Sequence, residues 1–374
     1  MYINGKIFLK IFIFFALNFM GMTEVLDINI NKTKTSKLKH LNLEDLPFGK
    51  HFTDHMLEAD YENGEWKNIE IKPYQPLLLE PSTSALHYGQ AIFEGMKAFR
   101  NHKDEAFIFR PYENLARFNL SALRMNMPEV GEELFIEGVR QLIEIDKSWI
   151  PSKTDHSLYI RPLMFATDAA IGVKPSDTYK FLIILSPVGP YHTLPMKIAV
   201  EEHYTRAAPG GVGFSKNAGN YGGSMLPATK AKEQGYDQVL WTDAFEHKWL
   251  QEVGMMNIGF IINNVFITPM LEDTILKGVT RDSVITILND MGIKTEERKI
   301  SIDEVIEAYK KGSVNEIFGM GTAAVISLIK ELKYKDFVMH FDTASFKIAL
   351  KVKHKLNEIR YGLVQDKYGW MFKI

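Results

Sequence analysis

Apolar and polar residues change their spacing several times along the first half of the chain. Short apolar runs with partial alternation predict strands at residues 52–61, 64–74, 105–110, 157–167 and 180–191. Between them, apolar residues recur every three or four positions over 110–125 and 131–146. This spacing predicts two amphipathic helices, the first with Pro111 near its start. The first half is therefore expected to be an α+β unit.

The second half follows a stretch rich in proline and glycine at 186–195, which predicts a connection between two domains. Asn263 and Asn264 suit a hairpin turn that needs positive φ. Gly235 suits the end of one helix and Thr280 the N-cap of another. The expected elements are helices at 224–235 and 277–292, strands at 237–243 and 315–329, and a hairpin at 257–269. The expected division is a small domain at 23–187, a connection at 188–195 and a large domain at 196–374.

Composition excludes several kinds of site. The chain has 374 residues, of which 46% are apolar and 24% charged, as in an ordinary globular protein. It contains no cysteine, which excludes disulfides, thiolate metal ligands and cysteine nucleophiles. Its net charge of −2 gives no reason to expect nucleic acid. Histidines and acidic residues are scattered and no metal-binding motif occurs, so no metal is predicted.

The N-terminal residues 1–22 combine basic residues with an apolar run, as a signal peptide does. Lys10 and Asn18 interrupt the run, which is too short for a membrane span of about 20 apolar residues. Because no small-residue cleavage site follows, we favour a true start at Met20 or Met22 and a cytoplasmic protein without a membrane partner. A secreted binding protein is the alternative.

The stretch 213–225, "GFSKNAGNYGGSM", places Lys216 among four glycines and Tyr221 five residues later. A lysine that forms a Schiff base needs a desolvated amine close to a carbonyl carbon. Glycines allow backbone to approach a planar ring, and the tyrosine is placed to bind a phenolic oxygen. Taken alone, the stretch fits a mobile surface loop better.

Glu252 lies in the apolar stretch "WLQEVGMMN". An ionised carboxylate in such surroundings is costly unless it is paired, and a protonated pyridine nitrogen would be a suitable partner. A glutamate at a strand edge, facing solvent, explains the pattern equally well.

Two glycine-containing turns are candidate anion sites. Residues 278–280 precede a helix, whose free N–H groups and dipole favour a phosphate. The second turn, "GMGTAA", offers the Thr322 hydroxyl. It also matches a dinucleotide fingerprint, but only about fifty residues follow, too few for that fold. Arg117 is a candidate for a charge-assisted contact with the same phosphate, or a solvated helix arginine.

Together these pieces call for a flat aldehyde with a phenolic oxygen, a ring nitrogen and one phosphate, which is pyridoxal phosphate. At this point the chain closely resembles the branched-chain amino acid aminotransferases of the fold type IV pyridoxal-phosphate class. The resemblance runs from about Phe48 to Leu328. Its motifs are "LHYGQAIFEGMKAFR", "FRPYENLARF", "SLYIRP", "SPVGPY", "GGVGFSKNAGNYGGSM", "QVLWTD", "QEVGMMN", "ILKGVTRDS" and "FGMGTAAVI".

The resemblance implies a fold and a cofactor site. The fold would be mixed α/β, with a smaller N-terminal α/β domain, a larger C-terminal pseudo-barrel domain and the active site at their interface. Lys216 would form the internal aldimine and move the proton between the substrate Cα and the cofactor. Tyr221 would contact the phenolic oxygen and Glu252 the pyridine nitrogen. The phosphate would lie against Arg117, Val279, Thr280 and Thr322.

The resemblance also implies the reaction: transamination of leucine, isoleucine and valine with 2-oxoglutarate in a ping-pong sequence. Arg161 would bind the distal carboxylate of glutamate, and the main chain at Thr322 and Ala323 the α-carboxylate. Apolar burial is non-directional and tolerates branched side chains. The family suggests an apolar pocket of Phe48, Tyr88, Phe93, Tyr159 and Tyr191. Core packing is the alternative for these aromatics, above all for Tyr191.

The sequence departs from some relatives at two places. Met255 stands where some place a small or hydroxyl residue, and Ala324 and Ser327 stand where some animal members carry a redox cysteine pair. Neither affects the core chemistry. The resemblance further implies a homodimer whose active sites borrow loop residues from the neighbouring copy. A D-amino-acid aminotransferase and an aminodeoxychorismate lyase share the lysine and glutamate and are the alternatives within the fold.

Overall fold

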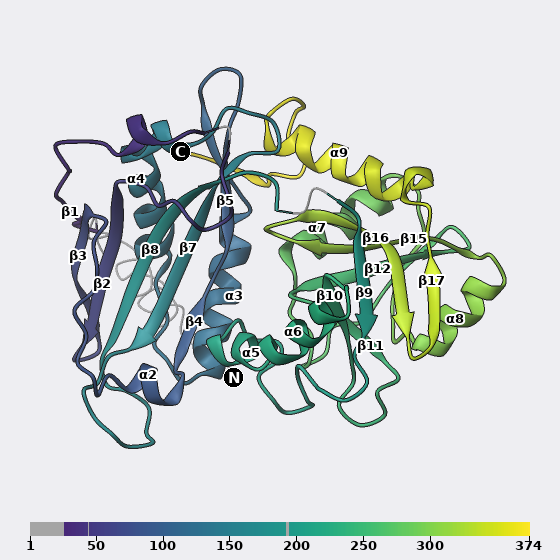
Figure 1. The fold of residues 1–374 in the computed structure, drawn as a ribbon. Coiled ribbons are helices and arrows are strands. Elements are labelled where there is room, and N and C mark those ends of the chain that lie inside the picture. The colour runs from purple at the N-terminus through teal and green to yellow at the C-terminus, as the bar shows by residue number, and fades with distance from the viewer. Residues whose placement is uncertain (1–25, 44, 192–193) are drawn as a thin grey trace, which may run out of the picture.

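The computed structural model describes residues 26–43, 45–191 and 194–374. The predicted leader or mis-assigned start at 1–22 lies outside the described residues. Within them, two large sheets stand side by side, each with helices packed against it (Figure 1). The chain is thus mixed α/β, as expected.

The first sheet has the order β1-β3-β2-β8-β7-β5-β6-β18, and β4 pairs with β7. Its last strand comes from the C-terminus and pairs antiparallel with β6. The final strand therefore lies in the sheet of the first half, although its residues belong to the predicted large domain at 196–374. The domain boundaries at 187 and 196 stay a prediction. The strands are β1 (Asn29–Ile30), β2 (His55–Glu62), β3 (Glu65–Pro73), β4 (Ala91–Phe93), β5 (Met96–Arg100), β6 (Ala106–Phe109), β7 (Ser157–Ala166), β8 (Tyr179–Val188) and β18 (Met371–Lys373).

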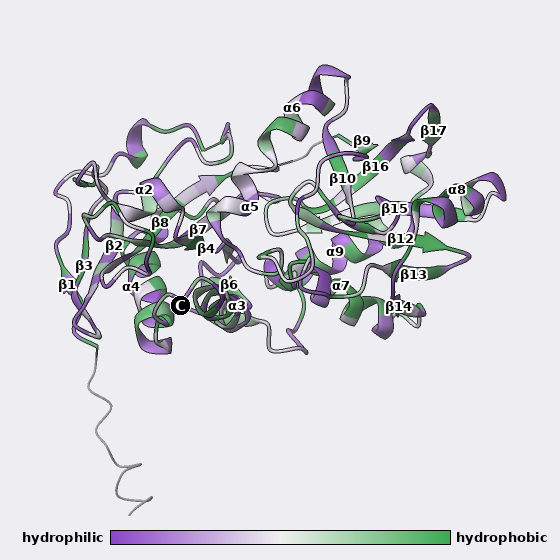
Figure 2. Cartoon of the chain, turned by 90° about the horizontal axis from the view of Figure 1, so that it is seen from below, coloured by the Kyte–Doolittle hydropathy of each residue, from purple (hydrophilic) through white to green (hydrophobic). Residues whose placement is uncertain are grey.

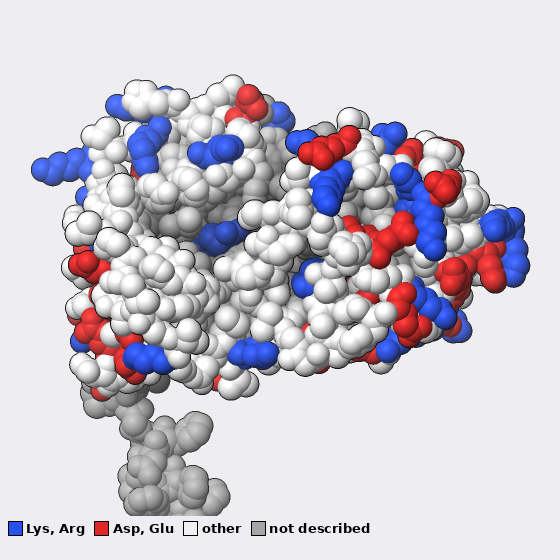
Figure 3. Space-filling view, turned by 60° about the horizontal axis from the view of Figure 1, so that its bottom comes forward, with Lys and Arg blue, Asp and Glu red and all other residues white. Residues whose placement is uncertain are grey.

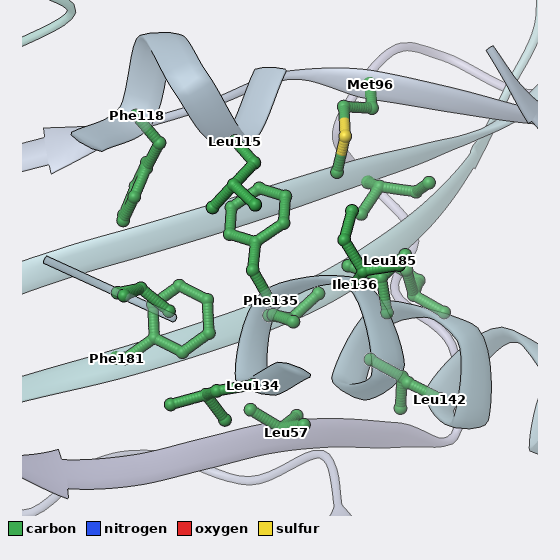
Figure 4. Packing of buried hydrophobic residues seen from close by; sticks show 14 of the residues in the cluster. Leu57, Met96, Leu115, Phe118, Leu134, Phe135, Ile136, Leu142, Phe181 and Leu185 are labelled. Carbon is green, nitrogen blue, oxygen red and sulfur yellow. The ribbon is translucent and has the colours of Figure 1, made fainter. Parts of the chain in front are cut away.

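Helices α3 and α4 cover one face of the first sheet. Figure 4 shows Phe118 of α3, Phe135 ahead of α4 and Phe181 of β8 pointing toward one another in the core. The approach is close at Gly138, because a Cβ there would lie 2.7 Å from the Leu57 side chain. The helical segments of this half are η1 (Leu38–His40), α2 (Ser84–Tyr88), α3 (Pro111–Arg124), a π-helical turn η2 (Glu133–Glu137), α4 (Gly138–Ile145) and η3 (Lys147–Trp149).

The second sheet closes on itself. Its order is β11-β10-β9-β16-β15-β12-β13-β14, β17 pairs with β16, and a further pairing of β11 with β12 joins six strands into a ring. This ring confirms the expected pseudo-barrel. The strands are β9 (Met196–Val200), β10 (Gln238–Thr242), β11 (Leu250–Val253), β12 (Met256–Ile262), β13 (Val265–Thr268), β14 (Thr295–Glu297), β15 (Val314–Gly321), β16 (Val325–Tyr334) and β17 (Phe337–His340).

The helices of the second half lie next to this ring, and Figure 2 shows α8 as largely hydrophilic. They are α5 (Ala218–Gly222), α6 (Met225–Glu233), α7 (Val279–Asp290), α8 (Ile302–Lys310), η4 (Thr343–Ser345) and α9 (Ile348–Arg360). Phe99 and Phe109 of the first sheet share one buried cluster with α7 and α9. Apolar packing thus joins the two halves.

Several local predictions are confirmed. Asn263 and Asn264 both have positive φ, 51° and 62°, and Gly235 has φ 85° just after α6. Pro111 is the first residue of α3. The N-cap prediction for Thr280 is wrong: the cap of α7 is Gly278. A Cβ at Gly278 would lie 1.9 Å from Asn257 Oδ1, so close packing requires glycine there, and the helix begins at the next residue.

Candidate active site

A cavity of about 490 Å³ lies between the two sheets and is lined by residues of both. Figure 3 shows a hollow between the two lobes with basic side-chain atoms inside it. Tyr88 is not among the lining residues and is 40% exposed on α2. The other predicted site residues all line the cavity: Phe48, Phe93, Arg117, Tyr159, Arg161, Tyr191, Lys216, Tyr221, Glu252, Val279, Thr280, Thr322 and Ala323.

The backbone around Lys216 is firmly held. Its N–H donates to Ser121 Oγ at 2.9 Å, and its C=O accepts from the Phe93 N–H at 3.0 Å. The neighbours Ser215 and Asn217 are 1% and 2% exposed. The mobile surface loop is therefore the wrong interpretation of this stretch.

One glycine of this stretch, Gly213, is required by close packing, whereas the space beside Gly222 is open. A Cβ at Gly213 would lie 2.5 Å from Ala207 Cβ and 2.8 Å from the Thr274 backbone. Beyond it the chain enters α5, which brings Tyr221 back over the lysine. Lys216 Nζ lies 2.7 Å from Tyr221 Oη and 4.8 Å from the centre of the Phe93 ring.

Glu252 lies on β11 and is 3% exposed, so the solvent-facing interpretation is wrong. Its Oε2 is 2.9 Å from Arg206 Nε, and its Oε1 accepts from the Leu276 N–H at 3.0 Å. Asn257 Nδ2 also donates to Oε1, at 3.3 Å. Burial raises the pKa of the Glu252 carboxyl, and Arg206 only partly opposes this. Sequence reasoning missed both partners: Arg206 lies in no recognised motif, and Asn257 is the last residue of the motif "QEVGMMN", which was assigned a role only at Glu252.

The start of α7 and the turn between β15 and β16 both face the cavity through Val279, Thr280, Thr322 and Ala323. The first N–H groups of a helix have no partner within the helix and favour an anion. These two turns provide backbone donors and two hydroxyls, but their lining residues bring no charged side chain.

Arg117 of α3 is held by a carboxylate that sequence reasoning missed. Its Nε and Nη2 donate to the two carboxylate oxygens of Glu94, at 2.7 and 2.9 Å, and its Nη1 donates to the Lys277 C=O at 2.9 Å. Glu94 is fully buried. Burial alone would raise its pKa, but the pairing with Arg117 dominates and lowers it. The arginine is thus a paired one, not a solvated one, and two of its five N–H donors have no partner among the described residues and could bind a ligand.

The first-sheet side of the cavity is aromatic. Tyr159 and Arg161 are two residues apart on β7 and therefore share one face of the strand. The Arg161 guanidinium lies 4.5 Å from the Phe93 ring centre, and its Nη2 donates to Tyr159 Oη at 3.0 Å. Its Nε is buried without a hydrogen-bond partner among the described residues. Tyr191 is 38% exposed, so it is not a core residue.

These residues fit pyridoxal phosphate. The cavity combines one lysine amine, a buried carboxylate for a ring nitrogen, a tyrosine hydroxyl beside the amine, and two backbone turns for a phosphate. Among residues 26–43, 45–191 and 194–374 no group of three or more side chains could hold a metal ion. In the same residues no helix is long and apolar enough to cross a membrane.

Comparisons with known proteins give one consistent family. Residues 91–332 match the model of the class IV aminotransferases. A probable branched-chain-amino-acid aminotransferase of Staphylococcus epidermidis is 47% identical over 88% of this chain and 93% of its own. Branched-chain-amino-acid aminotransferase 2 of Bacillus subtilis is 46% identical over 93% of this chain and 97% of its own.

Solved structures agree. The Escherichia coli branched-chain amino acid aminotransferase aligns with a TM-score of 0.70 and 26% identity over 85% of this chain and 98% of its own. The corresponding enzyme of Thermoproteus uzoniensis, solved with norvaline, aligns with a TM-score of 0.70 and 25% identity over 85% and 99%. Another branched-chain amino acid aminotransferase was solved in complex with N-(5'-phosphopyridoxyl)-L-glutamate, and it aligns with a TM-score of 0.68. The chain therefore belongs to the branched-chain amino acid aminotransferases, a pyridoxal-phosphate-dependent family within the class IV aminotransferases.

Proposed function

We propose that this chain transfers the amino group of leucine, isoleucine or valine to 2-oxoglutarate in a ping-pong sequence. The products are branched-chain 2-oxo acids and glutamate. The observation that carries the proposal is the Lys216 amine in a cavity with a buried carboxylate in one wall and an aromatic wall holding one arginine. When bound, pyridoxal phosphate supplies a carbonyl carbon that exchanges amino groups and a ring that accepts electron density from the substrate Cα.

The protein's own residues hold and move protons around that ring. Lys216 Nζ takes the proton from the substrate Cα and passes it to the cofactor. In the second half-reaction it moves a proton in the opposite direction. The Tyr221 hydroxyl, 2.7 Å from Nζ, keeps the amine in place. Glu252 keeps the pyridine nitrogen protonated, and Arg206 and the Leu276 N–H keep this carboxylate oriented.

The phosphate would be bound mainly by backbone. The N–H groups at the start of α7, with the hydroxyls of Thr280 and Thr322, form its cradle. Arg117 adds the two N–H donors that Glu94 and the Lys277 carbonyl leave free. This fixes the ring at one end, so that Lys216 and Glu252 act on defined atoms.

The aromatic wall would select the two kinds of substrate. Phe48, Phe93 and Tyr159 offer apolar surface to a branched side chain. Arg161 lies over the Phe93 ring, and its Nε has no hydrogen-bond partner among the described residues, so it suits the distal carboxylate of glutamate or 2-oxoglutarate. The α-carboxylate, common to both, would bind the main chain at Thr322 and Ala323.

A second copy of the chain would complete this pocket. Tyr88 is exposed on α2 and outside the cavity of its own chain. Leu78, Leu86, Ile171 and Val173 of the same half are more than half exposed, more apolar surface than isolated positions explain. In a homodimer, Tyr88 would reach the neighbour's site. Light scattering, which measures the molar mass in solution, tests the homodimer.

We also propose a cytoplasmic location, which N-terminal sequencing of the mature protein tests.

The proposed reaction is tested by the absorbance of the purified protein. We expect a yellow protein whose visible band disappears on adding leucine, and a faster reaction with leucine than with D-alanine or aminodeoxychorismate. A Lys216→Ala variant that keeps the visible band, or a colourless wild-type protein after addition of pyridoxal phosphate, would contradict the proposal.

A further inference from the structure

Two buried basic side chains have no carboxylate within ion-pair distance among the described residues. Lys97 lies on β5 and is 7% exposed, and Arg360 ends α9 and is 3% exposed. Neither forms an ion pair with any carboxylate of residues 26–43, 45–191 or 194–374. By contrast, Arg117 is paired with Glu94. Burying an unpaired charge is strongly unfavourable, so the fold alone gives no reason to retain both.

Both cations lie directly behind the two anion-binding turns. Lys97 Nζ donates to the Ala323 C=O at 2.8 Å. Arg360 stacks on the Phe109 ring, with its carbon Cζ 4.3 Å from the ring centre, and its Nε and Nη1 are buried without a hydrogen-bond partner in the described chain. Lys97 and Arg360 line one small void, together with Val279, Thr280 and Thr322.

The bond from Lys97 also orients a strained turn. Val325, the residue that ends it, has φ 62°, a conformation that a β-branched residue rarely adopts. In a trans peptide the C=O and the next N–H point in opposite directions. The Ala323 C=O points toward Lys97, so the Ala324 N–H points away from it.

The groups around the two turns do not balance the charge of a bound phosphate. The turns bring no charged side chain, and Glu94 compensates the charge of Arg117. A dianionic phosphate bound there still needs a positive counter-charge. In a low-dielectric interior, a charge behind a turn acts on an anion in front of it with little screening.

We propose that Lys97 and Arg360 are positioning residues, a buried cationic pair that stabilises the anions of the cavity, above all the cofactor phosphate, through the two turns. The pair touches neither cofactor nor substrate. The inference rests on the proposed function, which assigns the phosphate to these turns.

The test compares Lys97→Met and Arg360→Met with Lys97→Arg. Methionine removes the charge but keeps a long side chain that fills the same space, and arginine keeps the charge. Lys351→Met removes one exposed charge from α9 and is the matched control. Each cofactor-free protein is titrated with pyridoxal 5'-phosphate and with pyridoxal, which lacks the phosphate. Its melting temperature is measured with and without inorganic phosphate.

We expect each methionine variant to bind pyridoxal phosphate about tenfold more weakly and pyridoxal within about twofold of wild type. Inorganic phosphate should raise their melting temperatures less than that of wild type. Without ligand they should melt at the wild-type temperature or above it, because an unpaired buried charge is gone. Lys97→Arg should retain most of the affinity, and Lys351→Met all of it.

Other outcomes overturn the inference. An equal loss of affinity for both aldehydes, or unchanged phosphate stabilisation with a lower melting temperature, would assign a purely structural role to the pair. So would failure of both methionine variants to fold. If the wild type itself binds no pyridoxal phosphate, the proposed function fails as well, whereas wild-type binding with unaffected variants overturns only this inference.

Discussion

The two walls of the cavity are built in different ways. The wall from the ring of strands holds Glu252 and the two backbone turns, with the Lys216 loop beside it, and its polar atoms are fixed by hydrogen bonds. The wall from the first sheet is aromatic, with Arg161 as its charged side chain at β7. The difference separates two tasks: fixed polar groups suit proton transfer, whereas apolar surface suits a choice among side chains.

The largest effect should come from the polar wall, through Lys216→Ala. Since this removes the proton-transferring amine, we expect kcat to fall about 10⁴-fold or more. Stopped-flow or coupled assays with leucine measure it. Lys232→Ala, at an exposed position of α6, is the control and should keep wild-type kcat. A kcat of Lys216→Ala within tenfold of the wild-type value would mean that another base removes the proton from the substrate Cα.

Glu252→Gln should come next. The amide keeps the shape but no longer stabilises a protonated ring nitrogen, so kcat is expected to fall about 10²- to 10³-fold. The absorbance spectrum after reaction with leucine reports the same change. Glu233→Gln, exposed on α6, is the matched control. An equal loss in both variants would point to a general effect of lost negative charge.

The aromatic wall is tested by Arg161→Met. Loss of a charged hydrogen bond to the distal carboxylate should lower kcat/KM for 2-oxoglutarate about 10- to 100-fold. Leucine makes no such contact, so its half-reaction, measured in the same variant, should change less than about threefold. Parallel losses for both substrates would show that the two walls do not divide the work in this way.

The smallest effect concerns pH and the lysine behind the turns. In the cofactor-free protein, burial and the nearby charge of Arg360 lower the pKa of Lys97 to about 7. A bound phosphate would favour the charged form of this lysine, which the proposed role requires. The neighbouring charged groups are Arg360 on α9 and, more weakly, Asp155 ahead of β7. In the unfolded chain the pKa is ordinary, 10.5, so between these two values the unfolded state binds more protons.

The unfolding free energy of the cofactor-free protein should therefore rise with pH from about 7 toward 10.5. The Lys97 contribution is at most about 1.4 kcal/mol per pH unit. Urea unfolding of wild type and Lys97→Met at several pH values isolates this contribution as the difference between the two curves. A slope that is identical in both proteins would mean that Lys97 stays charged throughout.

Much of the site could be predicted because its residues lie in long motifs of fixed spacing. The helix start at Pro111, the Asn263–Asn264 turn and the ring of strands follow from local conformational preference or from the family resemblance. Thr280 failed as an N-cap because contact with Asn257, remote in sequence, selects glycine at 278. Local patterns carry no record of such contacts.

The linear chain was enough to specify which chemical groups are present: one lysine, one glutamate, two glycine turns and a set of aromatics. Their pairing depended on the fold. Glu94 meets Arg117 across 23 positions, Arg206 meets Glu252 across 46, and Lys97 meets Ala323 across 226. Charge compensation acts through space at a few ångströms. Only the packing of the two sheets therefore determines which charges are paired and which stay free for a ligand.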